Sequence, residues 1–134
     1  MHRTKIVTSF LENSDKILLL KRSEKVKSMK NLWAGISGII EGREKPITRA
    51  EIEIFEEVGF KKSDITLLKQ GDVIEIESPQ YANHLWEVYP FLFSCHRVNV
   101  NLNWENSDSK WIDKSELNNF ETVPSLEKVL ARLF

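Results

Sequence analysis

The chain has 134 residues, of which 41% are hydrophobic, and its 19 basic and 20 acidic residues give a formal net charge of −1. This length fits one folded unit, so we expect a single domain over residues 1–134. The hydrophobic content argues against disorder, and the balanced charge argues against a general nucleic-acid binder, which would be basic. The longest apolar run, residues 17–20, is far too short to span a bilayer, so no membrane role is expected.

Cysteine and histidine are rare in this chain. The one cysteine, Cys95, cannot form an intrachain disulfide, and the first ten residues lack the apolar segment of a secretory signal peptide. Both features fit a reducing compartment, so we expect a cytoplasmic protein. The three histidines show no paired ligand spacing and no CxxC occurs, so no zinc site is expected.

Strands are predicted on either side of a short turn near the N-terminus. Residues 5–11 and 16–22 are rich in β-forming residues and are separated by the turn-forming stretch 12–15, which predicts a hairpin. The second segment is apolar through its centre, so we expect it to be buried on both faces. A basic loop over residues 23–31 follows. Residues 32–40 alternate in polarity and contain two glycines, which predicts a strand with a bend.

One amphipathic helix is predicted in the middle of the chain, over residues 47–58. Pro46 is well placed for the first turn, and Gly59 is placed to end the helix in a left-handed conformation. Apolar residues recur at helical spacing and form the stripe expected to face the core: Ile47, Ala50, Ile54 and Val58.

The second half of the chain is mostly strand-like. Residues 64–78 and 82–95 are long and rich in β-formers, with a turn over residues 79–83 between them. The remaining predicted elements are an edge extension over 98–104, a strand over 109–113, a turn or short helix over 114–120 and an amphipathic helix over 124–134. The order β-β-β-α-β-β-β-α favours an α/β fold in which helices cover the faces of a mixed sheet.

Acidic residues gather on the predicted helix. Glu53, Glu56 and Glu57 share one side of it, at positions i, i+3 and i+4, and Glu44 lies in the loop before it. Like charges at this spacing repel by about 0.2–0.5 kcal/mol per pair, a repulsion that a divalent cation would remove. Carboxylate oxygens suit Mg²⁺ or Mn²⁺ in octahedral geometry. The alternative is an acidic helix face that is simply solvated.

The spacing of these residues resembles the Nudix box, G-x5-E-x7-R-E-U-x-E-E-x-G-U, in which U is a bulky apolar residue. Eight of its nine specified positions are present: Gly38, Glu44, Glu53, Ile54, Glu56, Glu57, Gly59 and Phe60. The predicted order of elements also resembles the Nudix order over nearly the whole chain. The resemblance implies a Nudix-type α/β/α sandwich with a mixed β-sheet between helices.

By this resemblance the chain is expected to be a Nudix pyrophosphohydrolase, which cleaves the pyrophosphate linkage of a nucleoside diphosphate derivative. Glu53, Glu56, Glu57 and the carbonyl of Gly38 would bind Mg²⁺, or alternatively Mn²⁺, and Glu44 would support them. Phosphoryl transfer needs charge neutralisation and in-line positioning, which metal ions supply. The expected partner is a small-molecule nucleotide derivative, and a homodimer is compatible with the sequence.

Residues outside the box complete the expected site. By the resemblance, Glu53 or Glu105 would act as the base that activates water, because Glu105 precedes Trp111 in a MutT-type arrangement. The alternative is that Glu105 is a polar loop residue. Lys21 and Arg22 end a predicted strand where MutT-like proteins place a basic residue that contacts phosphate, and Arg22 is the stronger candidate. Aromatic residues at strand positions are more often part of the core, and the candidates for stacking a base are Trp104 and Tyr81.

Ile52 stands where the box has arginine, which in the family buttresses the loop and the catalytic glutamates. Arg49 lies four residues before Glu53 and is expected to pair with it, the alternative being an ordinary surface arginine. The loss at Ile52 keeps open a second function, a catalytically weak Nudix-fold module that binds a nucleotide or a protein partner. Residues 7–29 and 33–38 resemble archaeal Nudix modules, which also leaves a binding role open.

Overall fold

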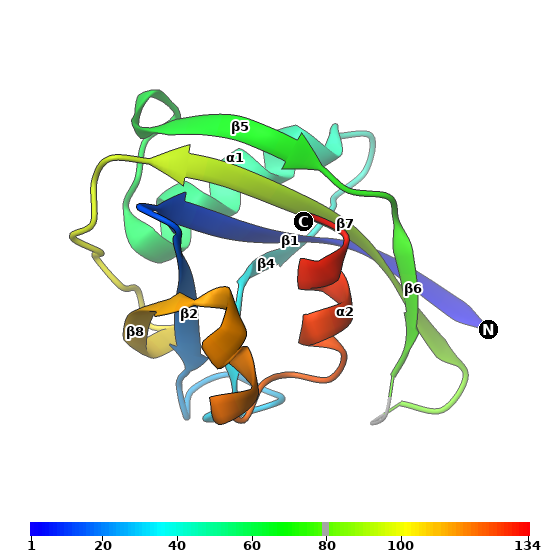
Figure 1. The fold of residues 1–134 in the computed structure, drawn as a ribbon. Helices are drawn as coiled ribbons and strands as arrows, with labels where there is room; N and C mark the ends of the chain where they lie inside the picture. The colour runs from blue at the N-terminus through cyan, green and yellow to red at the C-terminus, as the bar shows by residue number, and fades with distance from the viewer. Residues whose placement is uncertain (79–80) are drawn as a thin grey trace.

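The fold was determined as a computed structural model that describes residues 1–78 and 81–134 (Figure 1). It contains eight strands, two α-helices and two short 3-10 helices. In chain order these are β1 (His2–Asn13), β2 (Lys16–Arg22), β3 (Trp33–Ala34), β4 (Ile36–Ile39), α1 (Pro46–Val58), η1 (Lys62–Asp64), β5 (Ile65–Gln70), β6 (Ile74–Glu77), β7 (His84–Cys95), β8 (Asn106–Asp113), η2 (Lys114–Asn119) and α2 (Leu126–Ala131).

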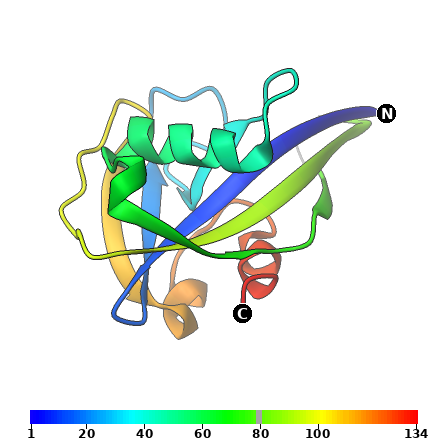
Figure 2. The ribbon, with the colours of Figure 1, turned by 90° about the horizontal axis from the view of Figure 1, so that it is seen from above.

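The strands form one mixed sheet that lies between two helical layers. Its main path runs β3-β2-β1-β7-β5, with β4 on β1, β6 on β7 and β8 on β2. β1 and β7 are parallel and the other pairs are antiparallel. Seen from above, α1 covers one face of the sheet, while α2 and η2 cover the other (Figure 2). The predicted α/β/α sandwich with a mixed sheet is therefore confirmed.

The sheet carries a hydrophobic core on each face. In β2, Ile17 and Leu19 join the core under α2, whereas Leu18 and Leu20 join the core under α1. Successive side chains of a strand point to opposite faces, so an uninterrupted apolar strand fits only where both faces are covered. The predicted burial of this segment on both faces is confirmed.

The predicted hairpin between β1 and β2 is present but short. Ser14 and Asp15 have φ of 49° and 66°, the left-handed values that a two-residue hairpin turn requires. Only Glu12 with Ile17 and Asn13 with Lys16 are paired across it. The rest of β1 pairs with β7 and β4 instead, and β2 continues along β8.

Helix α1 has the ends that the sequence predicts. Pro46 occupies the first turn, and Gly59 ends the helix at φ 79° with its N–H donating to the carbonyl of Phe55 at 3.0 Å. Three residues of the apolar stripe, Ala50, Ile54 and Val58, are fully buried against the sheet. The helix therefore lies with one face on β1 and β4, and its acidic residues lie to the side of that face.

The predicted strand with a bend over residues 32–40 is present as β3 and β4, which are divided at Gly35. This glycine lies so close to β1 that a Cβ would be 3.0 Å from the carbonyl oxygen of Ser9. Another predicted strand was too long. The strand expected over 64–78 breaks at Gly71, where a Cβ would be 2.9 Å from the carbonyl oxygen of Arg132. In both places the chain bends where glycine allows a close approach.

Two further expectations differ from the structure. Residues 98–104 form no strand, because their backbone groups make other hydrogen bonds. The N–H of Asn101 donates to the carbonyl of Val58 at the end of α1, and the indole N–H of Trp111 donates to the carbonyl of Val98. The terminal helix is shorter than expected, at six residues. Of the turn expected over 79–83, residues 79–80 lie outside the described part. No helix within the described ranges is long and apolar enough to cross a membrane.

Candidate active site

The candidate site begins where α1 meets β4. Gly38 lies on β4 opposite Val7, and a Cβ added to it would lie 2.3 Å from Cδ of Glu53. Real Cβ atoms do not approach other atoms this closely, so the side chain of Glu53 occupies the space that any other residue at position 38 would fill. Gly38 is therefore needed for Glu53 to lie directly against the strand.

Glu57 is the most deeply buried carboxylate of the group, with 4% of its surface exposed. Its Oε1 accepts a hydrogen bond from Nδ2 of Asn106 at 3.1 Å. Its Oε2 is buried and has no hydrogen-bond partner within the described residues. Burial raises the pKa of Glu57 well above its usual range, and the negative charges of Glu105 and Glu53 raise it further. Burying an oxygen without a hydrogen-bond partner costs free energy. This cost points to a bound partner from outside the protein chain.

Glu53 is also buried, but it has a cationic partner. Burial raises its pKa, and the charges of Glu56 and Glu105 add to the increase, while the hydrogen bond from Arg49 lowers it. Glu56 itself is exposed to solvent. The three helix glutamates therefore lie in different surroundings, with two buried next to each other and the third at the surface.

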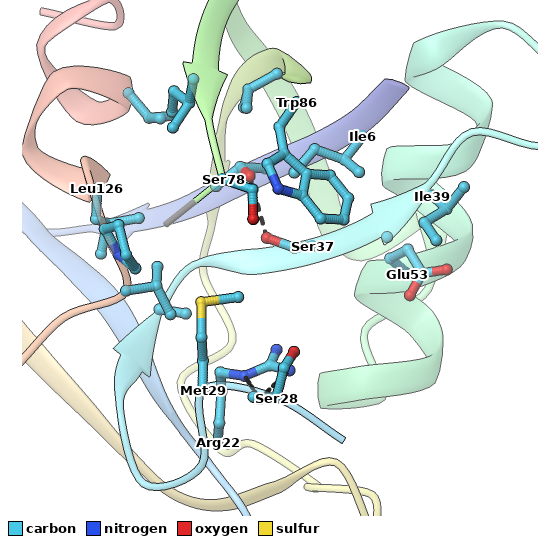
Figure 3. Close-up of a pocket in the computed structure, with 18 of the residues that line it drawn as sticks. Ile6, Arg22, Ser28, Met29, Ser37, Ile39, Glu53, Ser78, Trp86 and Leu126 are labelled. Atoms are coloured by element: carbon cyan, nitrogen blue, oxygen red, sulfur yellow. Dashed lines mark hydrogen bonds between the residues drawn. The ribbon is translucent and has the colours of Figure 1, made fainter. Parts of the chain in front are cut away.

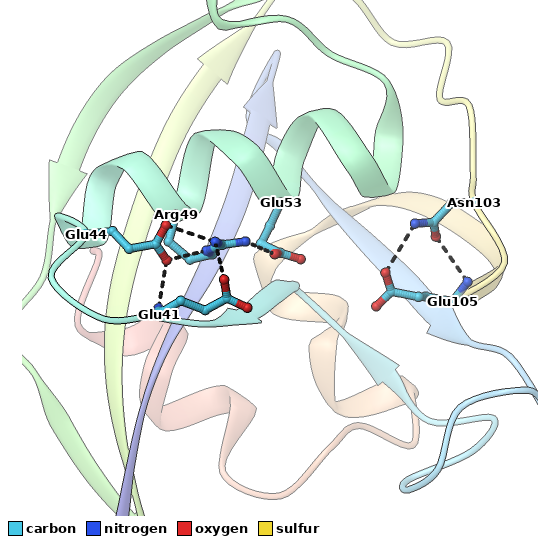
Figure 4. A network of polar contacts seen from close by, with 6 residues as sticks. All are labelled: Glu41, Glu44, Arg49, Glu53, Asn103 and Glu105. Carbon is cyan, nitrogen blue, oxygen red and sulfur yellow. Dashed lines mark hydrogen bonds and ion pairs between the residues drawn. The ribbon is translucent and has the colours of Figure 1, made fainter.

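Arg49 joins the loop after β4 to the helix, as Figure 4 shows. Its Nε and Nη2 donate to the two carboxylate oxygens of Glu44 at 2.7 and 2.9 Å, and its Nη1 donates to Oε2 of Glu53 at 2.9 Å. Nη2 also lies 3.4 Å from Oε2 of Glu41. The hydrogen bond from Arg49 and that from the backbone N–H of Glu41 lower the pKa of Glu44. The i,i+4 pair expected between Arg49 and Glu53 is therefore present.

Arg22 and Glu105 approach the buried glutamates from the other side. Nε and Nη2 of Arg22 donate to the carbonyl of Ser28 at 3.2 and 3.0 Å, which orders the basic loop around the guanidinium. Burial lowers the pKa of Arg22, and the charges of Glu57 and Glu105 oppose that change. Glu105 accepts a hydrogen bond from Nδ2 of Asn103 at 3.2 Å (Figure 4). The site therefore combines buried acidic groups with two arginines, Arg22 and Arg49.

Arg22, Arg49, Glu53 and Glu105 line one end of a cavity of about 650 Å³ (Figure 3). The predicted residues Glu44, Glu56 and Glu57 are not part of its lining. Its charged end includes Arg22, Glu53 and Glu105, beside Gly38. Its other end, which we call the apolar end, is lined by Ile6, Ile76, Trp86, Val88, Val123, Leu126 and Val129. A volume of this size accommodates a drug-sized ligand.

The structure brings some of the predicted residues to the cavity and keeps others away. The predicted residues that line it are Arg22, Gly38, Arg49, Glu53, Glu105 and Tyr81. Lys21 does not line the cavity, and the pairing of β2 with β8 is irregular between Lys21 and Arg22. Trp104 is 60% exposed and does not line it either.

Sequence reasoning missed two residues of this site. Trp86 lines the cavity, and its ring packs on His84 at 4.5 Å between centroids. Asn106 holds Glu57. The signal for Asn106 was its position directly after Glu105. No local signal marked Trp86, because its place in the cavity depends on the pairing of β7 with β1 and β6.

The carboxylate oxygens of this site are candidate ligands for a divalent cation. Within residues 1–78 and 81–134, no three His, Cys, Asp or Glu side chains are arranged to hold an ion together. The chemistry nevertheless fits Mg²⁺ or Mn²⁺, because Glu53 and Glu57 are neighbouring buried carboxylates and Oε2 of Glu57 has no protein partner in this part of the chain. Glu56 would have to turn inward from its exposed position to join them.

Solved structures share this fold at low sequence identity. A MutT NUDIX hydrolase from Burkholderia pseudomallei matches with a TM-score of 0.78 and 16% identity, over 100% of both chains. A C. elegans Ap4A hydrolase matches with a TM-score of 0.76 and 16% identity, over 99% of this chain and 95% of that one. The E. coli dihydroneopterin triphosphate pyrophosphohydrolase matches with a TM-score of 0.76 and 19% identity, over 96% and 91%. No curated protein sequence matches the chain.

These likenesses show that the chain has the fold of solved MutT and Nudix hydrolase structures. The family model described as NUDIX domain matches residues 2–133, so the chain belongs to the Nudix family and is a pyrophosphohydrolase. Members of this family cleave pyrophosphate bonds in nucleoside diphosphate derivatives, generally with a divalent metal ion.

Proposed function

We propose that this protein hydrolyses the pyrophosphate linkage of a nucleoside diphosphate derivative with the help of Mg²⁺, for which Mn²⁺ can substitute. The observation that carries the proposal is the pair of neighbouring buried carboxylates, Glu53 and Glu57, of which Glu53 lines the charged end of a cavity that Arg22 also lines. Two ionised carboxylates buried next to each other are unfavourable unless a cation lies beside them.

Each residue at the charged end has a role in this proposal. Glu53, Glu56, Glu57 and the carbonyl of Gly38 would hold the ion, which supplies charge neutralisation and an activated water when bound. Glu105 is placed to accept the proton of the attacking water, with Glu53 as the alternative base. Arg22 is fixed by the carbonyl of Ser28 in a position to contact a phosphate oxygen.

The apolar end of the cavity would hold the organic part of the substrate. Trp86 offers the face of an aromatic ring there, and Ile6 and Ile76 flank it on the neighbouring strands. Polar groups beside this wall include the hydroxyls of Thr8 and Ser37, which are 3.1 Å apart, and the side chains of Ser78 and Tyr81. A planar base that stacks and makes few hydrogen bonds fits such a lining. A cytoplasmic location and a homodimer stay predictions from the sequence.

The test is cleavage of a substrate panel with Mg²⁺, with Mn²⁺ and with EDTA. The panel contains deoxynucleoside triphosphates, nucleotide sugars, ADP-ribose, NADH and dinucleoside polyphosphates, and release of phosphate or nucleotide is measured. We expect metal-dependent cleavage of one class, which is lost in Glu57→Gln and kept in Glu51→Gln. Glu51 is a matched control because it lies on the same helix and makes only a 3.9 Å surface pair with Lys62.

The alternative function, a weakly catalytic binding module, rests on Ile52 in place of the box arginine. Absence of cleavage across the whole panel, together with Mg²⁺-dependent thermal stabilisation, would favour it over the proposed hydrolysis. The contacts of Arg49 argue for the enzyme, because they supply an arginine to the same glutamates from another position.

A further inference from the structure

Position 52 holds isoleucine where the Nudix box has an arginine, so the site lacks one expected positive charge there. Ile52 cannot donate a hydrogen bond, yet the loop glutamate Glu44 and the helix glutamate Glu53 both need a partner because both are partly withdrawn from water. Positions 49 and 52 are three apart in the sequence, an i,i+3 spacing that makes them neighbours on successive turns of α1. An arginine at either position therefore projects toward the same loop.

All three guanidinium nitrogens of Arg49 are in use. Nε and Nη2 form a two-point contact with Glu44, and Nη1 contacts Glu53. The side chain of Arg49 is only 11% exposed, so these are not solvated surface pairs. A lysine has one nitrogen and cannot satisfy two carboxylates in this planar arrangement.

The same contacts connect three segments of the site. Oε1 of Glu44 accepts from both Arg49 and the backbone N–H of Glu41, which closes the loop after β4 onto the helix. Arg49 then reaches Glu53, which lies directly against Gly38 of β4. Loop, helix and strand are thus joined through one guanidinium (Figure 4).

We propose that Arg49 is the positioning residue of this site and replaces, from one turn earlier in the helix, the arginine that is absent at position 52. Arg49 fixes the orientation of Glu53 through Oε2 and keeps Glu44 folded over the start of the helix. In this role Arg49 acts through the two glutamates, and its side chain also lines the cavity. The inference rests on the proposed function, because it concerns how Glu53 is presented to the cation.

The test compares the wild type with Arg49→Lys, Arg49→Gln and the double variant Arg49→Gln/Ile52→Arg. Arg43→Gln is the matched control, since Arg43 is an exposed arginine of the same loop. Two quantities are measured: Mn²⁺ affinity by electron paramagnetic resonance, without substrate, and kcat and KM on the substrate found with the panel. Circular dichroism and thermal melts identify any variant that fails to fold.

We expect Arg49→Gln to weaken Mn²⁺ affinity and to lower kcat by about 10–100-fold, as is typical of residues that orient metal ligands, with little change in KM. Arg49→Lys should lie between it and the wild type. The double variant should recover most of both losses, which general destabilisation would not predict. Arg43→Gln should behave as the wild type.

Two results would overturn the inference. One is an Arg49→Gln protein with wild-type Mn²⁺ affinity and kcat. The other is a folded double variant that is no better than Arg49→Gln in either measurement. A wild type that binds no Mn²⁺ and cleaves nothing would instead refute the proposed function, and this inference with it, before any variant is compared.

Discussion

The two ends of the cavity are built in different ways. The charged end comes mainly from one continuous stretch, Gly38 to Glu53, to which Arg22 and Glu105 are added. The apolar end is collected from β1, β6, β7 and the segment at α2, which are far apart in the sequence. The first end is encoded by local spacing, and the second exists only after the sheet has formed.

The two ends also differ in what they contribute to stability. Near the charged end, burial raises the pKa of both Glu53 and Glu57. The metal-free fold therefore disfavours the ionised form of these two carboxylates. At the apolar end, Leu126 and Val129 are almost fully buried, and their burial stabilises the fold. Substitutions of the buried glutamates should therefore lower activity and raise the stability of the metal-free protein. Substitutions at the apolar end should weaken substrate binding.

The largest effect is expected from Glu57→Gln. Turnover should fall by at least about 100-fold, because one metal ligand is lost. The metal-free protein should at the same time gain on the order of 1 kcal/mol in its free energy of unfolding, because a buried oxygen without a partner no longer carries a charge. Urea unfolding in EDTA and kcat in Mg²⁺ measure the two quantities.

Glu51→Gln serves as the comparison, since it removes a charge from the same helix without touching the cavity. It should change neither quantity appreciably. A Glu57→Gln protein that is less stable than the wild type in EDTA would contradict the view that the charged end is unfavourable in the metal-free fold.

A smaller effect is expected from Gly38→Ala, which tests the geometry of the charged end without changing its charge. The new Cβ would lie 2.3 Å from Cδ of Glu53, so that side chain must move. Activity should fall by about 10–100-fold, the range seen when a metal ligand is misoriented. Steady-state kinetics at saturating Mg²⁺ measure the loss.

The control for this change is Gly42→Ala. Gly42 has φ of 54° and nothing within 4 Å of its Cβ position, so alanine there strains the backbone but leaves Glu53 in place. It should lower stability by about 1 kcal/mol and leave activity unchanged. Equal losses of activity in both variants would mean that loop strain, and not the position of Glu53, limits turnover.

The same contrast explains how much the sequence could predict. The hairpin, the doubly buried β2, the helix ends at Pro46 and Gly59, and the pair of Arg49 with Glu53 all follow from interactions between residues close in the chain. Local propensity and spacing contain the information needed for each of them.

What could not be predicted depends on contacts between distant segments. The break at Gly71 arises because the C-terminal segment approaches that glycine, and this approach is not visible in the local pattern. Lys21 and Arg22 are neighbours in sequence, but only Arg22 lines the cavity, and the pairing of β2 with β8 is irregular between them. Trp104 was expected to stack a base, although Trp86 lines the cavity and Trp104 does not.

The smallest effect is expected from Trp86→Leu, which tests the apolar end. Leucine keeps an apolar side chain but removes the ring face, so KM for the substrate should rise by about tenfold, or roughly 1.4 kcal/mol, with little change in kcat. Trp104→Ala is the matched control, because that ring is 60% exposed outside the cavity, and its KM should equal that of the wild type. If Trp104→Ala raised KM and Trp86→Leu did not, the base would bind over the loop beside Glu105, and the apolar end would be a structural cavity unrelated to the substrate. If both variants kept the wild-type KM, recognition would come from the phosphates alone, and the charged end would account for both chemistry and binding.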